Sequence, residues 1–383
     1  MSINVKTDFF RSELGFVASA TKKVSSFTAL KEEKPELVVP WLVLCSVDGS
    51  SMRLFTTDHT VTLESRIPID NPLNEKWACA VDCRGLLAFV GRLKHGLFTV
   101  SSADGYVTIT HDRGTYKFIS AGQAIEYLGK HTSSETVKPV AHIPAHALRT
   151  VLSHAKIFAG KEPPTGRYDF RFVALRVQQS TLQAVSGDGS NFLAASAGGV
   201  ESEVTVEVNI PHIYIPILEK FTPIQTDKIT VTLTSTQARV DCVPRTAIIR
   251  LVPYATMPRV ENLFNPINFP FSVVIDAAEF KESVRLLMTV QKSNKVRRMD
   301  IVVDHSQMQL VARDPLDPAK QFEADHCVES QGAATFAVNM VPLWEFLKLA
   351  SGQLIIRINP TDDVKGFLFT AENNYEFVTA PVV

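Results

Sequence analysis

Apolar residues recur at helical spacing in three long segments of the chain, Val5–Lys23, Ile143–Lys161 and Ile275–Lys292. In each segment the apolar positions are separated by four and then three residues, which places them on one face of a helix. These positions are Phe10, Leu14 and Val17; Leu148, Leu152 and Ala155; and Phe280, Val284 and Leu287. The pattern predicts three amphipathic helices. The residue after the first apolar position is basic in each: Arg11, Arg149 and Lys281.

A second pattern also occurs three times. Two strand-like segments flank a polar turn that contains an aspartate, and these aspartates are Asp58, Asp188 and Asp314, separated by 130 and 126 residues. Asp and Gly favour such turns because their backbones tolerate unusual dihedral angles. We therefore predict three hairpins, one in each third of the chain.

A third pattern is a helix that follows a strand, in the segments numbered 80–96, 207–222 and 337–352. Val81, Val208 and Val338 occupy equivalent places in them, with spacings of 127 and 130 residues. Segments of alternating polarity follow each one, as expected for strands. Three patterns in the same order predict three copies of one α+β domain, each with two helices packed on antiparallel sheets.

The predicted domain boundaries lie in two segments rich in Pro, Ser or Asn, near Ser133–Val137 and Asn262–Asn268. They divide the chain into domains at 1–134, 135–264 and 265–383. The length of 383 residues agrees with this number, because one hydrophobic core rarely serves so long a chain.

With these repeats, the chain resembles the bacterial DNA polymerase III beta subunit, the sliding clamp. The resemblance covers essentially the whole length and also rests on the turn Ser186–Ala194, the segment Met257–Arg259 and the end Phe377–Val383. The family's turn usually reads Thr-Asp-Gly-His-Arg-Leu-Ala and its tail is close to Met-Pro-Met-Arg-Leu. The turn and the tail Ala380–Val383 depart from both forms, which marks a divergent member.

The resemblance implies half of a closed ring. Two three-domain subunits would join head to tail, with helices lining a central hole and strands forming the outer wall. Such a ring encircles duplex DNA without sequence preference and tethers a polymerase, which raises the local concentration of enzyme at the primer end. It implies no catalysis and no cofactor.

The net charge of the chain does not by itself suggest DNA binding, but the distribution of charge along the chain does. The whole chain has a formal net charge of −1, but the six predicted helices with their adjoining loops carry +10 and the remainder carries −11. A channel for DNA is expected to be basic because the phosphate backbone dominates sequence-independent binding. The residues that we expect near DNA are Arg11, Lys22, Lys23, Arg84, Arg92, Lys94, Arg149, Lys156, Lys161, Arg167, Tyr168, Lys281, Arg285 and Lys292.

In this family, the polymerase catalytic subunit and the clamp loader bind by short peptides in a groove between the second and third domains. The resemblance implies a groove formed by Phe170, Gly187, Gly189, Ser190, Asn191, Leu193, Pro258, Leu263, Asn339, Pro342, Val364, Gly366, Val378, Thr379, Ala380, Pro381, Val382 and Val383. Phe170, Leu193 and Leu263 could instead be core residues. The dimer interface would pair an edge strand of the first domain with one of the third, near Tyr116 and Phe118 on one side and Thr289 and Val290 on the other.

Other chemistry finds little support in the sequence. We find no phosphate-binding loop, no nucleophile elbow and no metal-ligand spacing, and the pair Asp314 and Asp317 reads as a turn. The chain has five cysteines, an odd number that argues against a framework of disulfides. This suggests a reducing, cytoplasmic compartment. The longest apolar stretch, Leu37–Cys45, is too short to cross a membrane. Two alternatives stay open: a clamp paralogue dedicated to a repair or mobile-element polymerase, and a metal-dependent DNA-processing enzyme.

Overall fold

A computed structural model describes thirteen stretches of the chain. They are residues 2–21, 39–70, 76–112, 114–130, 141–160, 169–202, 205–220, 228–233, 237–251, 263–291, 296–317, 319–359 and 366–381.

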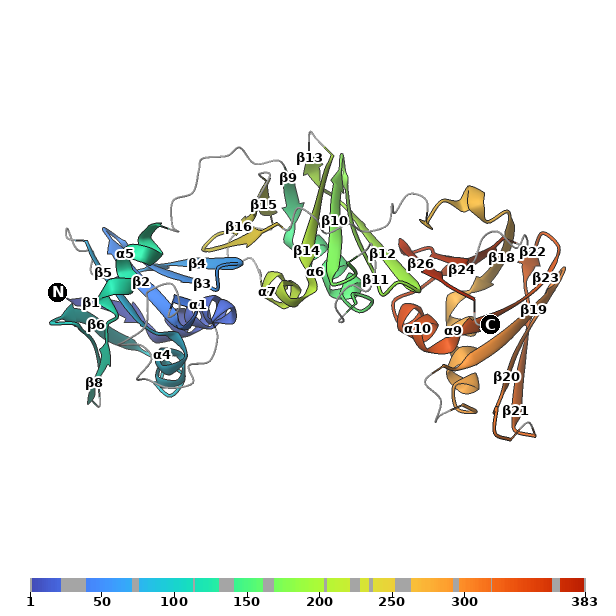
Figure 1. Ribbon diagram of the computed structural model, residues 1–383, viewed down its shortest axis with the longest axis horizontal. Coiled ribbons are helices and arrows are strands. Elements are labelled where there is room, and N and C mark those ends of the chain that lie inside the picture. Colours follow the sequence, from blue (N-terminus) through green and yellow to red (C-terminus); the bar gives the residue numbers. More distant parts are fainter. Residues whose placement is uncertain are drawn as a thin grey trace. The chain divides into compact units, whose positions relative to one another are not determined.

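The chain forms two compact units. Figure 1 labels their helices and strands. Unit 1 comprises residues Met1–His146, Glu201–Val204 and Pro216–Pro253, and unit 2 comprises Ala147–Val200, Thr205–Ile215 and Tyr254–Val383. Among the described residues, each unit has one four-stranded and one nine-stranded sheet. The fold is α+β, as predicted, and the three-domain division stays a prediction.

The main strands and helices occur in the same order three times along the chain, with short elements added in some repeats. The first repeat contains β1 (Ser2–Lys6), α1 (Thr7–Val17), η1 (Ala18–Ala20), η2 (Val39–Trp41), β2 (Leu42–Asp48), β3 (Ser51–Thr57), β4 (Val61–Pro68), β5 (Trp77–Asp82), α4 (Cys83–Val90), β6 (Leu97–Ala103), β7 (Tyr106–His111), β8 (Gly114–Ile119) and α5 (Gly122–Lys130).

The second repeat contains β9 (Ala141–Pro144), α6 (Ala145–Ala155), β10 (Phe172–Gln178), β11 (Thr181–Gly187), β12 (Asn191–Gly198), β13 (Glu201–Ser202), β14 (Val206–Pro211), η3 (His212–Tyr214), α7 (Ile215–Leu218), β15 (Lys228–Leu233), β16 (Gln237–Cys242) and β17 (Arg245–Arg250).

The third repeat contains η4 (Pro266–Asn268), β18 (Phe271–Asp276), α9 (Ala277–Leu287), β19 (Arg298–Asp304), β20 (Gln307–Arg313), β21 (Gln321–Cys327), β22 (Glu329–Ser330), β23 (Ala333–Asn339), α10 (Met340–Leu347), β24 (Gln353–Ile358), β25 (Phe367–Ala371) and β26 (Tyr375–Thr379).

The first helix of each repeat is shorter than the apolar pattern predicted. A strand (β1, β9 or β18) directly precedes each one, and the described helices α1, α6 and α9 each have 11 residues. The predicted apolar face is confirmed, since Phe10, Leu148 and Phe280 are all buried.

The second helix of the central repeat is also shorter than predicted. It reduces to a 3₁₀ turn followed by the four-residue helix α7, and Pro211 and Pro216 flank the 3₁₀ turn. Proline lacks an amide hydrogen and crowds the preceding turn, which disfavours a longer helix through this segment.

The predicted aspartate turns are confirmed at all three positions. The Asp58 carboxylate accepts hydrogen bonds from the backbone amides of Thr60 and Val61, at 2.9 and 2.8 Å. Asp188 accepts from the amides of Ser190 and Asn191, at 2.9 and 2.8 Å, and Asp314 from the amide of Leu316, at 2.9 Å. These local bonds fix the chain direction between the two strands of each hairpin.

Each nine-stranded sheet contains a strand pair that joins two repeats, which we call a seam. In unit 1 the sheet order is β13-β9-β15-β16-β17-β4-β3-β2-β5, with the seam between β17 and β4. In unit 2 the order is β14-β10-β11-β12-β26-β25-β24-β18-β22, with the seam between β12 and β26. Both seams are antiparallel and pair the last strand of one repeat with the fourth strand of the preceding repeat.

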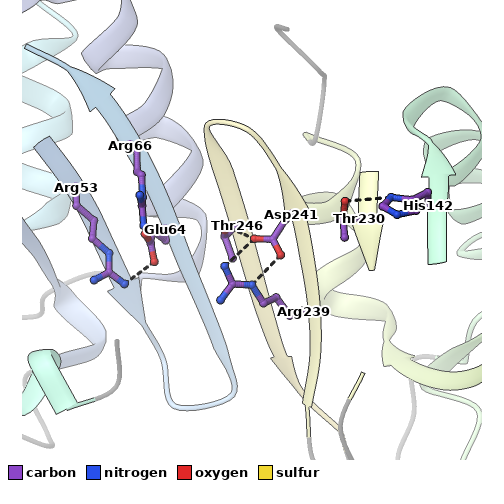
Figure 2. Close-up of polar contacts among 8 residues, drawn as sticks. All are labelled: Arg53, Glu64, Arg66, His142, Thr230, Arg239, Asp241 and Thr246. Carbon is purple, nitrogen blue, oxygen red and sulfur yellow. Dashed lines mark hydrogen bonds and ion pairs between the residues drawn. The ribbon is translucent and has the colours of Figure 1, made fainter. Parts of the chain in front are cut away.

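Charged side chains follow the unit 1 seam on one face of its sheet (Figure 2). Glu64 on β4 accepts a hydrogen bond from Arg53 at 2.5 Å, and on the other side of the seam Arg239 contacts Asp241 at 2.7 and 2.9 Å. Thr246 on β17 donates to Asp241 at 2.6 Å. The hydrogen bond with Asp241 raises the pKa of Arg239, and Glu64 adds to this shift. Charged groups of both repeats therefore line the seam, each held by partners of its own repeat.

The two four-stranded sheets leave strands at their edges. Their orders are β1-β6-β7-β8 in unit 1 and β21-β20-β19-β23 in unit 2. Strand β8 is the last strand of the first repeat and β21 is the fourth strand of the third, so these edges are the same two kinds of strand that meet in the seams.

Candidate DNA-facing helices and partner groove

Arg11 is held against the end of the neighbouring helix α4. Its guanidinium donates hydrogen bonds to the carbonyl oxygens of Val90 at 3.3 Å and Leu93 at 2.5 Å, and it forms an ion pair with Asp8 at 3.3 Å. A cation at the C-terminus of a helix compensates the partial negative charge of the last carbonyl groups. Arg11 thus has a structural role, and its side chain is 31% exposed.

Arg84 likewise contacts the backbone. It lies in the first turn of α4 and donates to the carbonyl oxygen of Thr21 at 2.9 Å. Asp82 caps this helix by accepting hydrogen bonds from the amides of Arg84 and Gly85, at 3.2 and 2.9 Å. Burial raises the pKa of Asp82, although these amide bonds oppose the shift.

The remaining described cations of the predicted set differ in exposure. Arg92 and Lys94 are exposed in the segment after α4, Arg149 is exposed on α6, and Lys156 is half-buried just beyond it. Lys281 is half-buried on α9. Six predicted DNA-facing residues lie outside the described residues: Lys22, Lys23, Lys161, Arg167, Tyr168 and Lys292.

Arg285 is exposed on α9 but is engaged by Glu282, at 2.8 and 2.5 Å. The hydrogen bond with Arg285 lowers the pKa of Glu282. Of the cations described on the first helices, Arg149 and Lys281 are therefore better placed for loose contact with phosphates than Arg11 or Arg285.

An apolar cluster lies beside the Asp188 turn in unit 2. Phe170 and Leu263, both predicted for the groove, pack half-buried on this cluster, and Val378 belongs to it. The other buried members are Ala174, Val185, Phe192, Ala194, Phe264, Phe269 and Leu368. The structure therefore brings together predicted groove residues from distant parts of the sequence.

Two predicted glycines leave room for aromatic rings in this cluster. A Cβ atom at Gly187 would overlap the ring of Phe192, and one at Gly189 would lie 3.2 Å from the ring of Phe170. Gly189 also has a φ of +99°, which side-chain-bearing residues rarely adopt. The two rings lie 5.8 Å apart in an edge-to-face arrangement.

Phe192, which sequence reasoning missed, takes the place in this cluster that we expected for Leu193. Successive side chains of a strand point to opposite faces of the sheet, so Leu193 lies on the other face and is completely buried. The turn after Asp188 has the same length as the turn after Asp58. In each, the backbone amide of the aspartate donates to the carbonyl oxygen of the residue three positions later, Asn191 or Val61. Counting from the turn could have identified Phe192.

The C-terminal strand forms the polar border of the cluster. Thr379 donates to the side chain of Asn191 at 2.8 Å, and the amide of Ala380 donates to the carbonyl of Ser190 at 2.9 Å. A Cβ at Gly366 would lie 3.4 Å from the carbonyl oxygen of Thr379. These contacts bring five further groove residues to one place, with Pro381 half-buried next in sequence.

The other predicted groove residues either lie away from the apolar cluster or fall outside the described residues. Asn339 caps α10 by accepting a hydrogen bond from the amide of Val341 at 3.1 Å, and Pro342 is half-buried in that helix. Neither belongs to the apolar cluster. Pro258, Val364, Val382 and Val383 lie outside the described residues.

The predicted interface residues lie on an edge strand, β8, and in the segment that follows helix α9. On β8, Tyr116 is 53% exposed and Phe118 is half-buried, and the ring of Phe89 on α4 lies 4.2 and 5.7 Å from their rings. Thr289 is exposed and Val290 half-buried just after α9. Helix α9 packs against β20 and β21.

The described residues contain no cluster of three or more His, Cys, Asp or Glu side chains that could hold a metal ion. No helix among them is both long and apolar enough to cross a membrane.

No family model and no curated protein sequence matches the chain. Solved structures do match. A DNA polymerase sliding clamp from Pseudomonas aeruginosa, crystallised with a ligand, is 18% identical with a TM-score of 0.81, and the match covers 100% of this chain and 99% of that one. DNA polymerase III beta subunit from Thermotoga maritima is 14% identical with a TM-score of 0.77 and the same coverage.

A third match is the Helicobacter pylori beta clamp, whose structure contains a bound DNA ligase peptide. It is 14% identical with a TM-score of 0.75, and both chains are covered completely. The likeness extends over all three repeats and is not confined to one domain. The chain therefore has the fold of the DNA polymerase III beta sliding clamps.

Proposed function

We propose that this chain is the subunit of a DNA sliding clamp: a homodimeric, non-catalytic ring that encircles duplex DNA and tethers a DNA polymerase. The observation that carries the proposal is the match to clamp chains over the full length of both proteins. A ring holds DNA by topology, so it needs no sequence-specific contacts and no reactive side chain.

The positions of the charges support a DNA-facing role for the first helices. Arg149 and Lys281 occupy equivalent helical positions, each directly after a buried apolar residue. Exposed or half-exposed cations on a helix attract phosphates without reading the base sequence, which suits a ring that must slide.

The seams support closure of a ring by a second copy. Two fourth strands, β4 and β12, already pair with two last strands, β17 and β26. The remaining fourth strand is β21 and the remaining last strand is β8, and both are sheet edges. We infer that β8 of one copy pairs antiparallel with β21 of the second, which would occur twice in a two-subunit ring.

The existing seams also suggest the register of this pair. In the first seam Leu63, five residues after Asp58, lies opposite Ala247, the third residue of β17. Leu193, five residues after Asp188, occupies the equivalent place in the second seam, opposite Phe377.

In the third repeat the turn is three residues longer, because the amide of Asp314 bonds to the carbonyl of Lys320. Phe322 is therefore the counterpart of Leu63, and Tyr116 is the third residue of β8. The inferred register places Phe322 of one copy opposite Tyr116 of the other.

The side chains on the two edges are complementary in this register. An aromatic pair would cover the exposed ring of Tyr116. Lys117 would lie opposite Gln321 and diagonal to Glu323, within reach of long side chains across an antiparallel pair. Thr289 and Val290 follow the helix that packs on β21, which supports their predicted place near this interface.

The apolar cluster around Phe170, Phe192 and Leu263 supports a groove for a short partner peptide. An apolar surface with a polar border of backbone and side-chain groups is well suited to anchor a few apolar side chains. Phe192 at its centre motivates the second reading, a clamp dedicated to a specialised polymerase. Binding of the host's replicative polymerase peptide would favour the main clamp, and failure of that peptide alone would favour the specialised one.

The test of the ring is covalent closure around DNA. In a Cys327→Ser background, Tyr116→Cys and Phe322→Cys are combined, the protein is assembled on nicked circular DNA, and the interfaces are oxidised. We expect a complex that survives denaturant and releases the DNA when the circle is cut. A protein that binds DNA but is lost equally from circular and linear DNA after crosslinking would contradict the ring.

A further inference from the structure

Three cysteines lie together in the core of unit 1. Cys45 on β2, Cys79 on β5 and Cys83 at the start of α4 are 3%, 0% and 0% exposed, and all are free thiols. Nothing in the proposed clamp function uses them. Cys327, by contrast, is exposed at the end of β21.

Cys45 and Cys79 are directly opposite each other on neighbouring antiparallel strands. Because facing residues project to the same side of a sheet, both thiols point into the same part of the core. Cys79 is also the leading cause of the raised pKa of the Cys45 thiol, as expected for two adjacent thiols.

The backbone identifies which kind of pair this is. The adjacent residue Ala80 turns its polar groups away from β2: its amide donates to the hydroxyl of Ser120 at 3.3 Å, and its carbonyl accepts from the amide of Ala121 at 2.7 Å. Since residues alternate along a ladder, Cys79 directs its own amide and carbonyl to β2. Such pairs have Cα atoms about 5.5 Å apart, which lies within the range of disulfides, but their Cβ atoms are about 1 Å wider apart than a disulfide holds them. The bond therefore closes when the edge strand β5 moves toward β2 by about that amount.

We propose that Cys45 and Cys79 are a redox modification site, where peroxide or a disulfide oxidant forms a reversible cross-strand disulfide that ties β5 to β2. With peroxide, one thiolate attacks the O–O bond to give a sulfenic acid and hydroxide. The second sulfur then displaces hydroxide from the sulfenic sulfur. Overall, two thiols and one peroxide give one disulfide and two molecules of water.

The position of the bond gives it a structural consequence. Strand β5 is the edge of the nine-stranded sheet, and it leads directly into α4 through the capping residue Asp82. The loop closed by the bond contains β3 and the seam strand β4. Oxidation therefore ties the edge that supports α4 to the strands that carry the seam.

The reaction is gated by opening of this edge. Both thiols are buried, and the pKa of Cys45 is raised by the adjacent Cys79 and by burial, so little thiolate forms at neutral pH. Burial also raises the pKa of Cys83 to about 12. Oxidation is thus slower than that of the exposed Cys327, because the thiolate is the reactive form.

The test is disulfide mapping of the full-length protein in a Cys327→Ser background, which removes crosslinks between molecules. The folded protein is incubated with hydrogen peroxide or with oxidised glutathione, unfolded with an alkylating reagent, digested without reduction and analysed by mass spectrometry. We expect a peptide that links Cys45 to Cys79, with Cys83 alkylated. We also expect a melting temperature raised by about 5 °C, reversed by dithiothreitol.

Cys83→Ser should leave the linked peptide unchanged, whereas Cys79→Ala should abolish it. Recovery of Cys45 and Cys79 as alkylated thiols or as sulfinic acids under both oxidants would overturn the proposal, as would a bond from Cys45 to Cys83. Mapping on the Cys327→Ser protein decides between these outcomes even if Cys79→Ala does not fold.

Discussion

Arg245 on β17 and Glu13 on α1 form a buried ion pair that connects the second repeat to the first. The guanidinium contacts both carboxylate oxygens at 2.9 and 2.8 Å, and the side chains are 10% and 0% exposed. Ser65 on β4 donates to the same carboxylate at 2.6 Å, and the guanidinium lies 4.9 Å from the ring of Phe16. One ion pair thus connects α1 to both strands of the seam.

Loss of this arginine should destabilise unit 1 strongly. Arg245→Leu leaves the Glu13 carboxylate buried without its counter-charge, and we expect the free energy of unfolding to fall by about 3 kcal/mol or more. Chemical denaturation followed by fluorescence measures the change. Arg66→Leu is the control, because its side chain is 70% exposed and its loss should cost less than about 1 kcal/mol. Equal effects of the two substitutions would argue against the role of the pair.

Charge reversal tests the inferred pairing of β8 with β21. Lys117→Glu and Glu323→Lys each place like charges across the interface, and we expect each to weaken the dimer by about tenfold or more. The combined variant restores opposite charges and should recover most of the affinity. Sedimentation of each variant over a concentration series gives the dissociation constants. Lys76→Glu is the control, because Lys76 is exposed and lies just before β5. It should leave association unchanged. Additive loss in the combined variant would exclude the proposed register.

Reversing the accessible cations of the first helices should weaken DNA binding. In the variant Arg149→Glu with Lys281→Glu, fewer phosphates are neutralised, so the loss should be larger at low salt than at high salt. Titration of duplex DNA at several salt concentrations should show a smaller salt slope, by about 1 to 2. Lys76→Glu is the control, because Lys76 is exposed just before β5 and belongs neither to the predicted helices nor to the inferred interface. An unchanged slope would remove Arg149 and Lys281 from the DNA-facing surface.

A methyl group at Gly187 should disturb the proposed groove. Gly187→Ala forces the ring of Phe192 to move, and overpacking of this kind costs about 1 to 3 kcal/mol. We expect a lower melting temperature and weaker binding of a fluorescent partner peptide. Gly198→Ala is the control, since its Cβ would meet no atom within 4 Å. Unaltered stability and peptide affinity of Gly187→Ala would show that Phe192 is not confined by this glycine.

Unit 2 should lose stability on mild acidification. Burial lowers the pKa of His154, whose Nδ1 lies 2.6 Å from the Tyr375 hydroxyl, and burial also lowers the pKa of His326. A histidine with a lowered folded-state pKa takes up protons more readily when unfolded, so stability is full above about pH 6.5 and declines as the pH falls below that value.

Melting temperatures between pH 8 and pH 5 measure this decline. His154→Asn should make the decline shallower, and adding His326→Asn should make it shallower again. A decline of the same steepness in all three proteins would assign it to other groups.

Much of the local structure was predictable because it depends on short-range spacing. The apolar faces of α1, α6 and α9 follow from residues three and four apart, and the hairpin turns follow from Asp58, Asp188 and Asp314. The limits of these predictions are also local. Strands β1, β9 and β18 directly precede the helices, and the apolar pattern did not separate strand from helix there. In the central repeat, Pro211 and Pro216 shorten the second helix.

The sequence by itself therefore determined the three repeats, the α+β class and which residues of the first helices face a core, because each depends on the periodicity of neighbouring residues. Only the tertiary structure decided that Arg11 is occupied by the carbonyls of Val90 and Leu93, and that Phe192 rather than Leu193 joins the apolar cluster. It also decided that β4 meets β17 and β12 meets β26. These facts depend on strand register and on contacts between residues far apart in the chain, which no local pattern specifies.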